Sequence, residues 1–189
     1  MAHRFDPKKV HKLDNPERRK LLPPEEILAP LQIGEQEDVA DIGVGPGYFA
    51  IPASRLTSGT VYGVDVEPQM LGFLKEKANE AGAANIVPVQ SDAEAIDLAD
   101  GSVDKVFCAF ILHELADLTK GLSEIKRILR PGGKLLVLEW EKKQTESGPP
   151  VEERLDAPEL AASIEKFGFA TEIIRPNPNH YMILGTQTT

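Results

Sequence analysis

The sequence predicts an α/β protein with a doubly wound, mostly parallel seven-stranded sheet whose last strand is antiparallel. Two observations favour this class. Short apolar runs rich in β-branched residues alternate with segments of helical spacing, which is typical of strand and crossover helix in turn. A glycine-rich turn, Gly43 to Gly47, follows the first apolar run directly. A ligand site at the carboxyl edge of the sheet is therefore expected.

Five apolar runs have the composition of buried parallel strands. They span 38–42, 60–65, 85–90, 103–109 and 134–140. Helical spacing predicts crossover helices over 48–57, 68–81 and 119–129. Pro68 suits a first helical turn, Gly82 suits a helix C-cap, and the Pro131-Gly132-Gly133 turn is expected to stop the third helix. After a polar loop, the pattern predicts a helix at about 157–167 and a hairpin-like strand pair at 169–175 and 180–187.

The length of 189 residues fits a single domain, 1–189. We divide it into a helical arm (1–34), a cofactor-binding core (35–140) and a C-terminal loop, helix and strand pair (141–189). Residues 1–20 hold seven basic and three acidic side chains, in contrast to the acidic remainder. These basic side chains could meet an anionic substrate, but a solvated face is the favoured interpretation. As a separate hypothesis, we expect the arm to fold over the ligand cleft as a lid. The apolar residues that would bury against the cleft edge are Leu21, Leu22, Ile27, Leu28 and Leu31.

Composition excludes several classes of protein. The net charge of −9 argues against a surface that binds nucleic-acid backbones. The single cysteine, Cys108, excludes an intrachain disulfide and a cysteine-only metal cage, so no metal is expected and a reducing cytoplasm fits. No apolar run reaches the roughly 18 residues of a membrane span, and no signal-peptide pattern opens the chain. We therefore expect a cytoplasmic protein without a membrane span.

The spacing of the glycines in this turn helps to distinguish between possible cofactors. A dinucleotide fingerprint requires a glycine three residues after Gly45, but Tyr48 stands there. The second strand ends on Asp65, where a carboxylate can accept both hydroxyls of a ribose. Asp41 within the turn would be unfavourable beside a pyrophosphate and favourable beside a cationic amino acid or a sulfonium. These residues favour S-adenosylmethionine over a nicotinamide cofactor.

Four segments in order resemble the motifs of class I S-adenosylmethionine-dependent methyltransferases, a Rossmann-like family. They are VADIGVGPGYFAIPAS, VYGVDVEPQML, SDAEAIDLADGSVDKVFCAFILHEL and LRPGGKLLVLEW. Within that family the chain is similar to small stand-alone members of the ubiquinone/menaquinone C-methyltransferase and arsenite methyltransferase type, with a methyltransferase domain 11-like pattern. Arsenite-type enzymes use several cysteines, so an arsenic acceptor is disfavoured here.

The resemblance implies a set of cofactor contacts. It assigns Gly43, Gly45 and Gly47 to the methionine portion of S-adenosylmethionine, with Asp41 near its amino group, and Asp65 to the ribose. Further contacts that it implies are Val66 and Met70 at the sugar and adenine, Asp92 and Ala93 at the adenine edge, and Phe110 beside the sulfonium. Asp92 could instead cap a short helix, and Met70 could instead fill the core.

Methyl transfer from a sulfonium is an in-line displacement, so a general base is needed only for a protonated acceptor. His113 follows the fourth strand and is the candidate catalytic and substrate-facing residue, with packing or helix capping as the alternative. Glu139 and Trp140 end the fifth strand and could line the acceptor pocket, although Trp140 could be core. His180 could approach the pocket or simply occupy the hairpin. Glu114 is expected to be solvated.

We therefore expect an enzyme that transfers a methyl group to a small-molecule acceptor, with nucleic acid an unfavoured partner. Cys108, the possible nucleophile of a base methyltransferase, fits a small core residue better. A non-catalytic or regulatory module that binds S-adenosylmethionine is the alternative, and an NAD-dependent oxidoreductase is a weaker one. The acceptor and the oligomeric state are left open.

Overall fold

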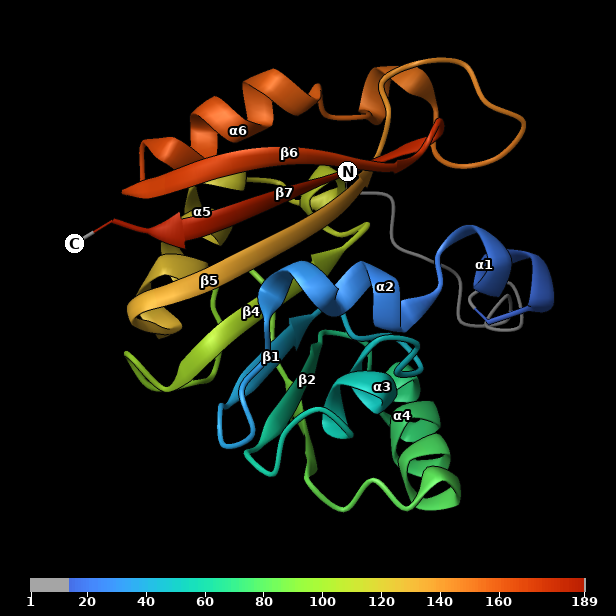
Figure 1. Cartoon of the computed structure of the whole chain (residues 1–189), viewed down its shortest axis with the longest axis vertical. Helices are drawn as coiled ribbons and strands as arrows, with labels where there is room; N and C mark the ends of the chain where they lie inside the picture. The colour runs from blue at the N-terminus through green and yellow to red at the C-terminus, as the bar shows by residue number, and fades with distance from the viewer. Residues whose placement is uncertain (1–13, 189) are drawn as a thin grey trace.

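Seven strands form one sheet in the order β3-β2-β1-β4-β5-β7-β6 in the computed structural model, which describes residues 14–188 (Figure 1). The strands are β1 (Val39–Ile42), β2 (Val61–Asp65), β3 (Ile86–Gln90), β4 (Val103–Ala109), β5 (Leu129–Trp140), β6 (Phe169–Asn177) and β7 (His180–Gln187). Neighbours from β3 to β5 pair in parallel, whereas β7 is antiparallel to both β5 and β6. The predicted doubly wound sheet with a reversed last strand is confirmed.

The helices cover both faces of this sheet (Figure 1). The arm and the helices α3 (Ala50–Ser54) and α4 (Pro68–Ala81) lie on one face, and α5 (Leu118–Ile128) and α6 (Ala157–Glu165) lie on the other. Side chains alternate along β4, so Phe107 packs on the first face and Cys108 on the second. Cys108 is a free, fully buried cysteine, as expected for a core residue.

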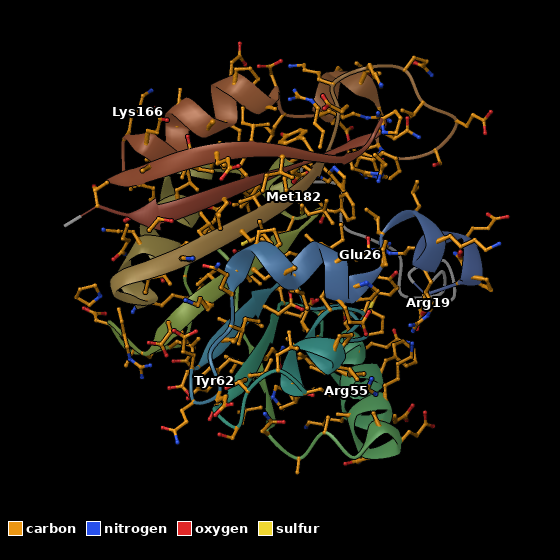
Figure 2. All side chains as sticks on the ribbon, viewed as in Figure 1. Arg19, Glu26, Arg55, Tyr62, Lys166 and Met182 are labelled. Carbon is orange, nitrogen blue, oxygen red and sulfur yellow. The ribbon has the colours of Figure 1, made fainter. Side chains whose placement is uncertain are left out.

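The described part of the arm consists of α1 (Pro16–Leu21), α2 (Pro24–Leu28) and a 3₁₀ turn, Ala29–Leu31. Four of its five candidate apolar residues are buried, but Leu21 is 42% exposed. The buried ones, Leu22 among them, pack with Met182 and other side chains of the sheet face (Figure 2). They are thus part of the hydrophobic core on this face of the sheet. Arg4, Lys8, Lys9 and Lys12, which supply most of the basic charge, lie outside the described residues.

The predicted helix over 48–57 is too long. The residues before Ala50 form a turn in which the Gly47 N–H donates to the Val44 carbonyl at 3.1 Å. At the other end, the Asn85 amide donates to the carbonyls of Ser54, Thr57 and Gly59 at 3.2, 3.1 and 2.9 Å. The Asn85 side chain therefore binds the last carbonyl of α3 and two carbonyls of the turn that follows it.

The Pro131-Gly132-Gly133 turn does not stop a helix. α5 already ends at Ile128, and Leu129 is extended with φ −72° and ψ 135°. Because the residue before a proline disfavours the helical region, Pro131 bars Arg130 from the helix, but the helix has already ended at Ile128. Leu129 pairs with Val103 and Lys134 pairs with Lys105, so the turn is an irregularity inside β5. Strand β5 therefore begins before the predicted 134.

Candidate functional site

The glycine turn leads out of β1 at the carboxyl edge of the sheet. The N–H groups of Gly43 and Val44 both donate to the Val64 carbonyl, at 2.8 and 2.9 Å. Gly43, Gly45 and Gly47 have φ values of 73°, 53° and 91°. A Cβ at Gly43 would lie 2.9 Å from Ile111 Cγ1. The turn therefore depends on glycine for its backbone angles and for close approach of its neighbours.

Asp65 ties this turn to the end of β2. Its Oδ2 accepts the Gly45 N–H at 2.9 Å, and its Oδ1 accepts the Glu67 N–H at 2.9 Å. Burial raises the pKa of Asp65, against the lowering effect of these backbone hydrogen bonds. The carboxylate thus stands at the strand end, as the sequence predicted, with both oxygens held in place.

Asp41 lies in β1, two residues before the glycine turn, and is 4% exposed. Burial and then the charge of Asp65 raise the pKa of Asp41 to about 8, against a lowering hydrogen bond from the Ala50 backbone. A buried carboxyl group whose ionisation a neighbouring carboxylate disfavours is an environment that a nearby cation stabilises. This part of the edge therefore suits a positively charged ligand group.

A cavity of about 130 Å³ opens beside these residues, at the ends of β1 and β2. Five predicted cofactor residues line it: Gly43, Asp65, Val66, Asp92 and Ala93. The other five do not contribute to its lining: Asp41, Gly45, Gly47, Met70 and Phe110. The carboxylate of Asp92 also accepts the Glu94 N–H at 2.9 Å, which caps a local turn. Met70 is buried on α4 at 4% exposure, as a core residue would be.

Glu114 lines the same cavity, together with Ile111. The expectation that Glu114 is solvated is wrong, because a 3₁₀ turn, Leu112–Glu114, carries it back into the edge of the sheet. Burial raises the pKa of Glu114 to about 7, although the neighbouring His113 lowers it. In the sequence, only its position directly after the candidate residue His113 indicated that Glu114 could belong to the site.

His113 and Glu139 meet on the face of the sheet that α5 and α6 cover. His113 Nδ1 lies 2.8 and 3.1 Å from the two oxygens of Glu139, and the His113 backbone N–H donates to Oε1 at 3.3 Å. Glu139 is 1% exposed. Burial alone would lower the pKa of His113, but the hydrogen bond and charge of Glu139 raise it above its usual value. Two residues predicted separately thus form one unit.

Trp140 lies on the opposite face from Glu139, because successive strand residues alternate. It pairs with His180 across β5 and β7, and its ring centroid lies 4.3 Å from that of His180. Phe110, at the end of β4, joins them at centroid distances of 5.6 Å to Trp140 and 5.4 Å to His180. Phe110 has φ 57°, a conformation uncommon for a bulky side chain that is often found at functional sites.

The strand order, the glycine turn and the carboxylates at the ends of β2 and β3 define a class I methyltransferase fold. The chain belongs to the family described as "Methyltransferase domain", whose sequence model matches residues 40–137. The class predicted from the four motifs is therefore confirmed, and the nicotinamide alternative has no support. S-adenosylmethionine is the cofactor that this membership implies.

Three similar proteins illustrate the relationship. The ubiquinone/menaquinone biosynthesis C-methyltransferase of Marinomonas sp. is 32% identical over 157 residues, 78% of this chain and 62% of that protein. The demethylmenaquinone methyltransferase of Deinococcus radiodurans is 40% identical over 103 residues, 54% of this chain and 42% of that protein. A SAM dependent methyltransferase from Aquifex aeolicus superimposes with a TM-score of 0.91 at 32% identity, covering 98% of this chain and 100% of that one. The chain thus spans less than two thirds of the length of either curated relative.

Within residues 14–188, no helix is long and apolar enough to cross a membrane. The same part of the chain brings no three His, Cys, Asp or Glu side chains together in a way that could hold a metal ion.

Proposed function

We propose that this protein transfers a methyl group from S-adenosylmethionine to a small-molecule acceptor. The observation that carries the proposal is the cavity between Gly43, Asp65 and Asp92, in a chain of the methyltransferase family. Its position at the carboxyl ends of neighbouring parallel strands is where doubly wound sheets bind nucleotide-like ligands.

The residues at this edge fit the cofactor. Gly47 has φ 91° and a Cβ there would meet Leu74 Cδ1 at 2.6 Å, so the narrow turn favours a glycine backbone. Asp65 would hold the ribose hydroxyls, and Asp92 with Ala93 would meet the adenine, while Val66 and Met70 would contact the sugar and base. The glycines would accommodate the methionine portion, with the buried Asp41 near its ammonium and Phe110 beside the sulfonium.

The cofactor supplies an electrophilic methyl group on a positively charged sulfur. The chain's own part is to align the acceptor and, for a protonated acceptor, to remove a proton. We propose His113 for that role, with Glu139 as its positioning residue. Because Glu139 binds Nδ1, the imidazole keeps its proton there and offers Nε2 as the base. The raised pKa of His113 makes it a stronger base than a free imidazole.

The proposed acceptor is a planar, quinone-like or phenolic small molecule. The names of the Marinomonas and Deinococcus relatives support this class. The half-buried rings of Phe110 and Trp140 support it too, because aromatic planes at the ends of β4 and β5 suit a flat ligand. We also propose that the protein acts in the cytoplasm, since its one cysteine forms no disulfide.

The test is turnover by the full chain. Purified protein is incubated with S-adenosylmethionine and a panel of small phenols, quinols and thiols, and S-adenosylhomocysteine is quantified by mass spectrometry. We expect acceptor-dependent product with a phenol or quinol and its loss in His113→Ala. Cofactor binding without turnover of any acceptor would favour the non-catalytic binding module.

A further inference from the structure

Two polar atoms near the ring of Phe110 are buried and have no hydrogen-bond partner in the described part of the chain: Arg18 Nε and His180 Nε2. The His180 ring centroid lies 5.4 Å from that of Phe110. The Arg18 guanidinium carbon also lies 5.4 Å from the Phe110 ring centroid. Leaving a buried donor or acceptor unpaired costs about 1–3 kcal/mol per group. The Arg18 guanidinium carbon lies closer still, at 4.8 Å, to the Tyr48 ring centroid, so among residues 14–188 aromatic rings and not polar partners surround these two atoms.

The hydrogen bonds of Asn177 fix the chemical character of His180. The Asn177 side-chain amide donates to the Leu21 carbonyl at 3.0 Å, and its Oδ1 accepts the Asn179 N–H at 3.0 Å. These two hydrogen bonds identify which end of the Asn177 amide is the oxygen, and this Oδ1 lies 2.9 Å from His180 Nδ1. Nδ1 must then carry the proton and donate, which leaves Nε2 with a bare lone pair.

The surroundings keep this imidazole neutral. Burial lowers the pKa of His180 to about 4, with smaller contributions from the charges of Arg18 and Arg154. His180 is 1% exposed. Nε2 is therefore a hydrogen-bond acceptor at physiological pH, and a poor general base. The neighbouring Arg18 has the opposite character, because its Nε–H can only donate.

A hydroxyl has the hydrogen-bonding chemistry that both atoms require. A hydroxyl donates its proton to a lone pair and accepts a hydrogen bond through its oxygen. The rings of Phe110, Trp140 and His180 provide the flat apolar walls that would hold an aromatic ring next to it. Phe110 and Trp140 are half-buried, so the walls open toward the surface.

We propose that Arg18 and His180 form a hydroxyl-recognition subsite that selects acceptors carrying a hydroxyl group on an aromatic ring. The acceptor's O–H donates to His180 Nε2, and its oxygen accepts the Arg18 Nε–H. This inference rests on the proposed function, because the protein, as a methyltransferase, would bind its acceptor next to Phe110. It gives the arm a specificity role, because α1 supplies Arg18 and is held to the hairpin by the Asn177–Leu21 hydrogen bond.

Binding of a matched ligand pair to the full chain tests the subsite without turnover. Naphthol carries the hydroxyl, and methoxynaphthalene has the same rings but no O–H to donate. With S-adenosylhomocysteine present at saturation, calorimetry should give at least tenfold tighter binding of naphthol. Nitrogen NMR of labelled protein should show His180 Nε2 shifting toward a hydrogen-bonded position with naphthol only.

The variants separate the two atoms from the rest of the cluster. Arg18→Lys keeps the charge but removes the Nε–H, and His180→Phe keeps a ring but removes Nε2. Each should reduce the preference for naphthol to threefold or less. Arg19→Lys is the matched control on the same helix, where Arg19 is exposed and paired with Asp14 (Figure 2). It should leave the preference unchanged.

Equal affinity for the two probes, an unchanged preference in both variants, or no binding of naphthol would overturn the proposal. Equal affinity would mean that a buried water satisfies both atoms. If His180→Phe fails to fold, Arg18→Lys and the NMR shift of the wild type still decide the question. A naphthol preference in a protein that transfers no methyl group would refute the proposed function and leave the subsite intact.

Discussion

The carboxylate of Glu139 lies 2.8 Å from Nδ1 of His113 and is 1% exposed. The two residues come from the end of β5 and from the 3₁₀ turn after β4, and they are 26 positions apart in the chain. A buried carboxylate in this position fixes both the tautomer and the orientation of the imidazole. The tautomer and orientation of the proposed base are therefore fixed by the fold before any acceptor binds.

Removing this charge should change the titration of His113. In Glu139→Gln, the hydrogen bond weakens and burial then lowers the pKa of His113 from its raised value. A base works when deprotonated, so the rising limb of kcat against pH should move to lower pH. The maximum rate should fall by about 100-fold, the lower range for loss of a positioned base. Histidine NMR titration measures the pKa directly.

Glu153→Gln is the control for this variant, because Glu153 is an exposed carboxylate whose charge raises the pKa of His113 only weakly. We expect almost no change in its pH profile. An unaltered His113 pKa in Glu139→Gln would contradict the positioning role.

Asp41 should make the protein without cofactor less stable as the pH rises. The unfolded chain releases this proton near the ordinary value of 3.8, whereas the folded chain holds it to about 8. Between these values the folded state binds more protons, so the free energy of unfolding declines with increasing pH. Asp41→Asn should flatten that decline, as measured by urea unfolding across this range. The exposed Asp97→Asn should retain it, and parallel curves for Asp41→Asn and wild type would refute the assignment.

Two glycine substitutions should have opposite effects on stability. Gly47 has φ +91° and a Cβ there would lie 2.6 Å from Leu74 Cδ1, so Gly47→Ala should cost about 2 kcal/mol or more. Gly72 lies within α4 with no atom within 4 Å of an added Cβ. Gly72→Ala should therefore stabilise by about 0.5–1 kcal/mol, since alanine favours a helix. Chemical denaturation measures both, and a tolerated Gly47→Ala would show that the turn can relax.

Arg154 should hold the loop that follows β5. Its guanidinium donates to the carbonyls of Glu141, Lys143, Ser147 and Pro149 and to Thr145 Oγ1. Lysine cannot reproduce this set of planar donors. Trypsin should therefore cleave Arg154→Lys faster after Lys142 and Lys143. The control Arg175→Lys changes an exposed guanidinium that pairs with Glu141, and it should leave the cleavage rate close to wild type. Equal rates in Arg154→Lys and wild type would show that the loop does not depend on Arg154.

The sequence predicted the residues whose positions follow from the strands themselves. Asp65 ends one β-rich run and Asp92 comes shortly after the next one. Parallel pairing of the two strands brings both residues to the same edge of the sheet, so the strand positions alone predict that they lie together. Gly43 could also be predicted from the sequence, because a turn directly after a strand requires backbone angles that favour glycine.

Residues that depend on distant pairing could not be found this way. His180 reaches Trp140 only through the register of the antiparallel β5–β7 pair, and Arg18 reaches Phe110 only through the packing of the arm. The last carbonyl of α3, that of Ser54, is bound by Asn85 from the turn before β3. Such contacts join segments that lie far apart in the sequence. They produce no hydrophobic periodicity or residue spacing, so the sequence does not indicate them.

The most direct test of the account is calorimetric titration of the full chain with S-adenosylhomocysteine, in wild type and in Asp65→Asn. We expect micromolar binding to wild type and a loss of at least tenfold in Asp65→Asn, because the ribose hydroxyls lose a charged acceptor. Glu76→Gln, on the exposed side of α4, should bind as wild type does. Absence of binding to wild type, or equal affinity in Asp65→Asn, would contradict the assignment of this edge of the sheet as the cofactor site.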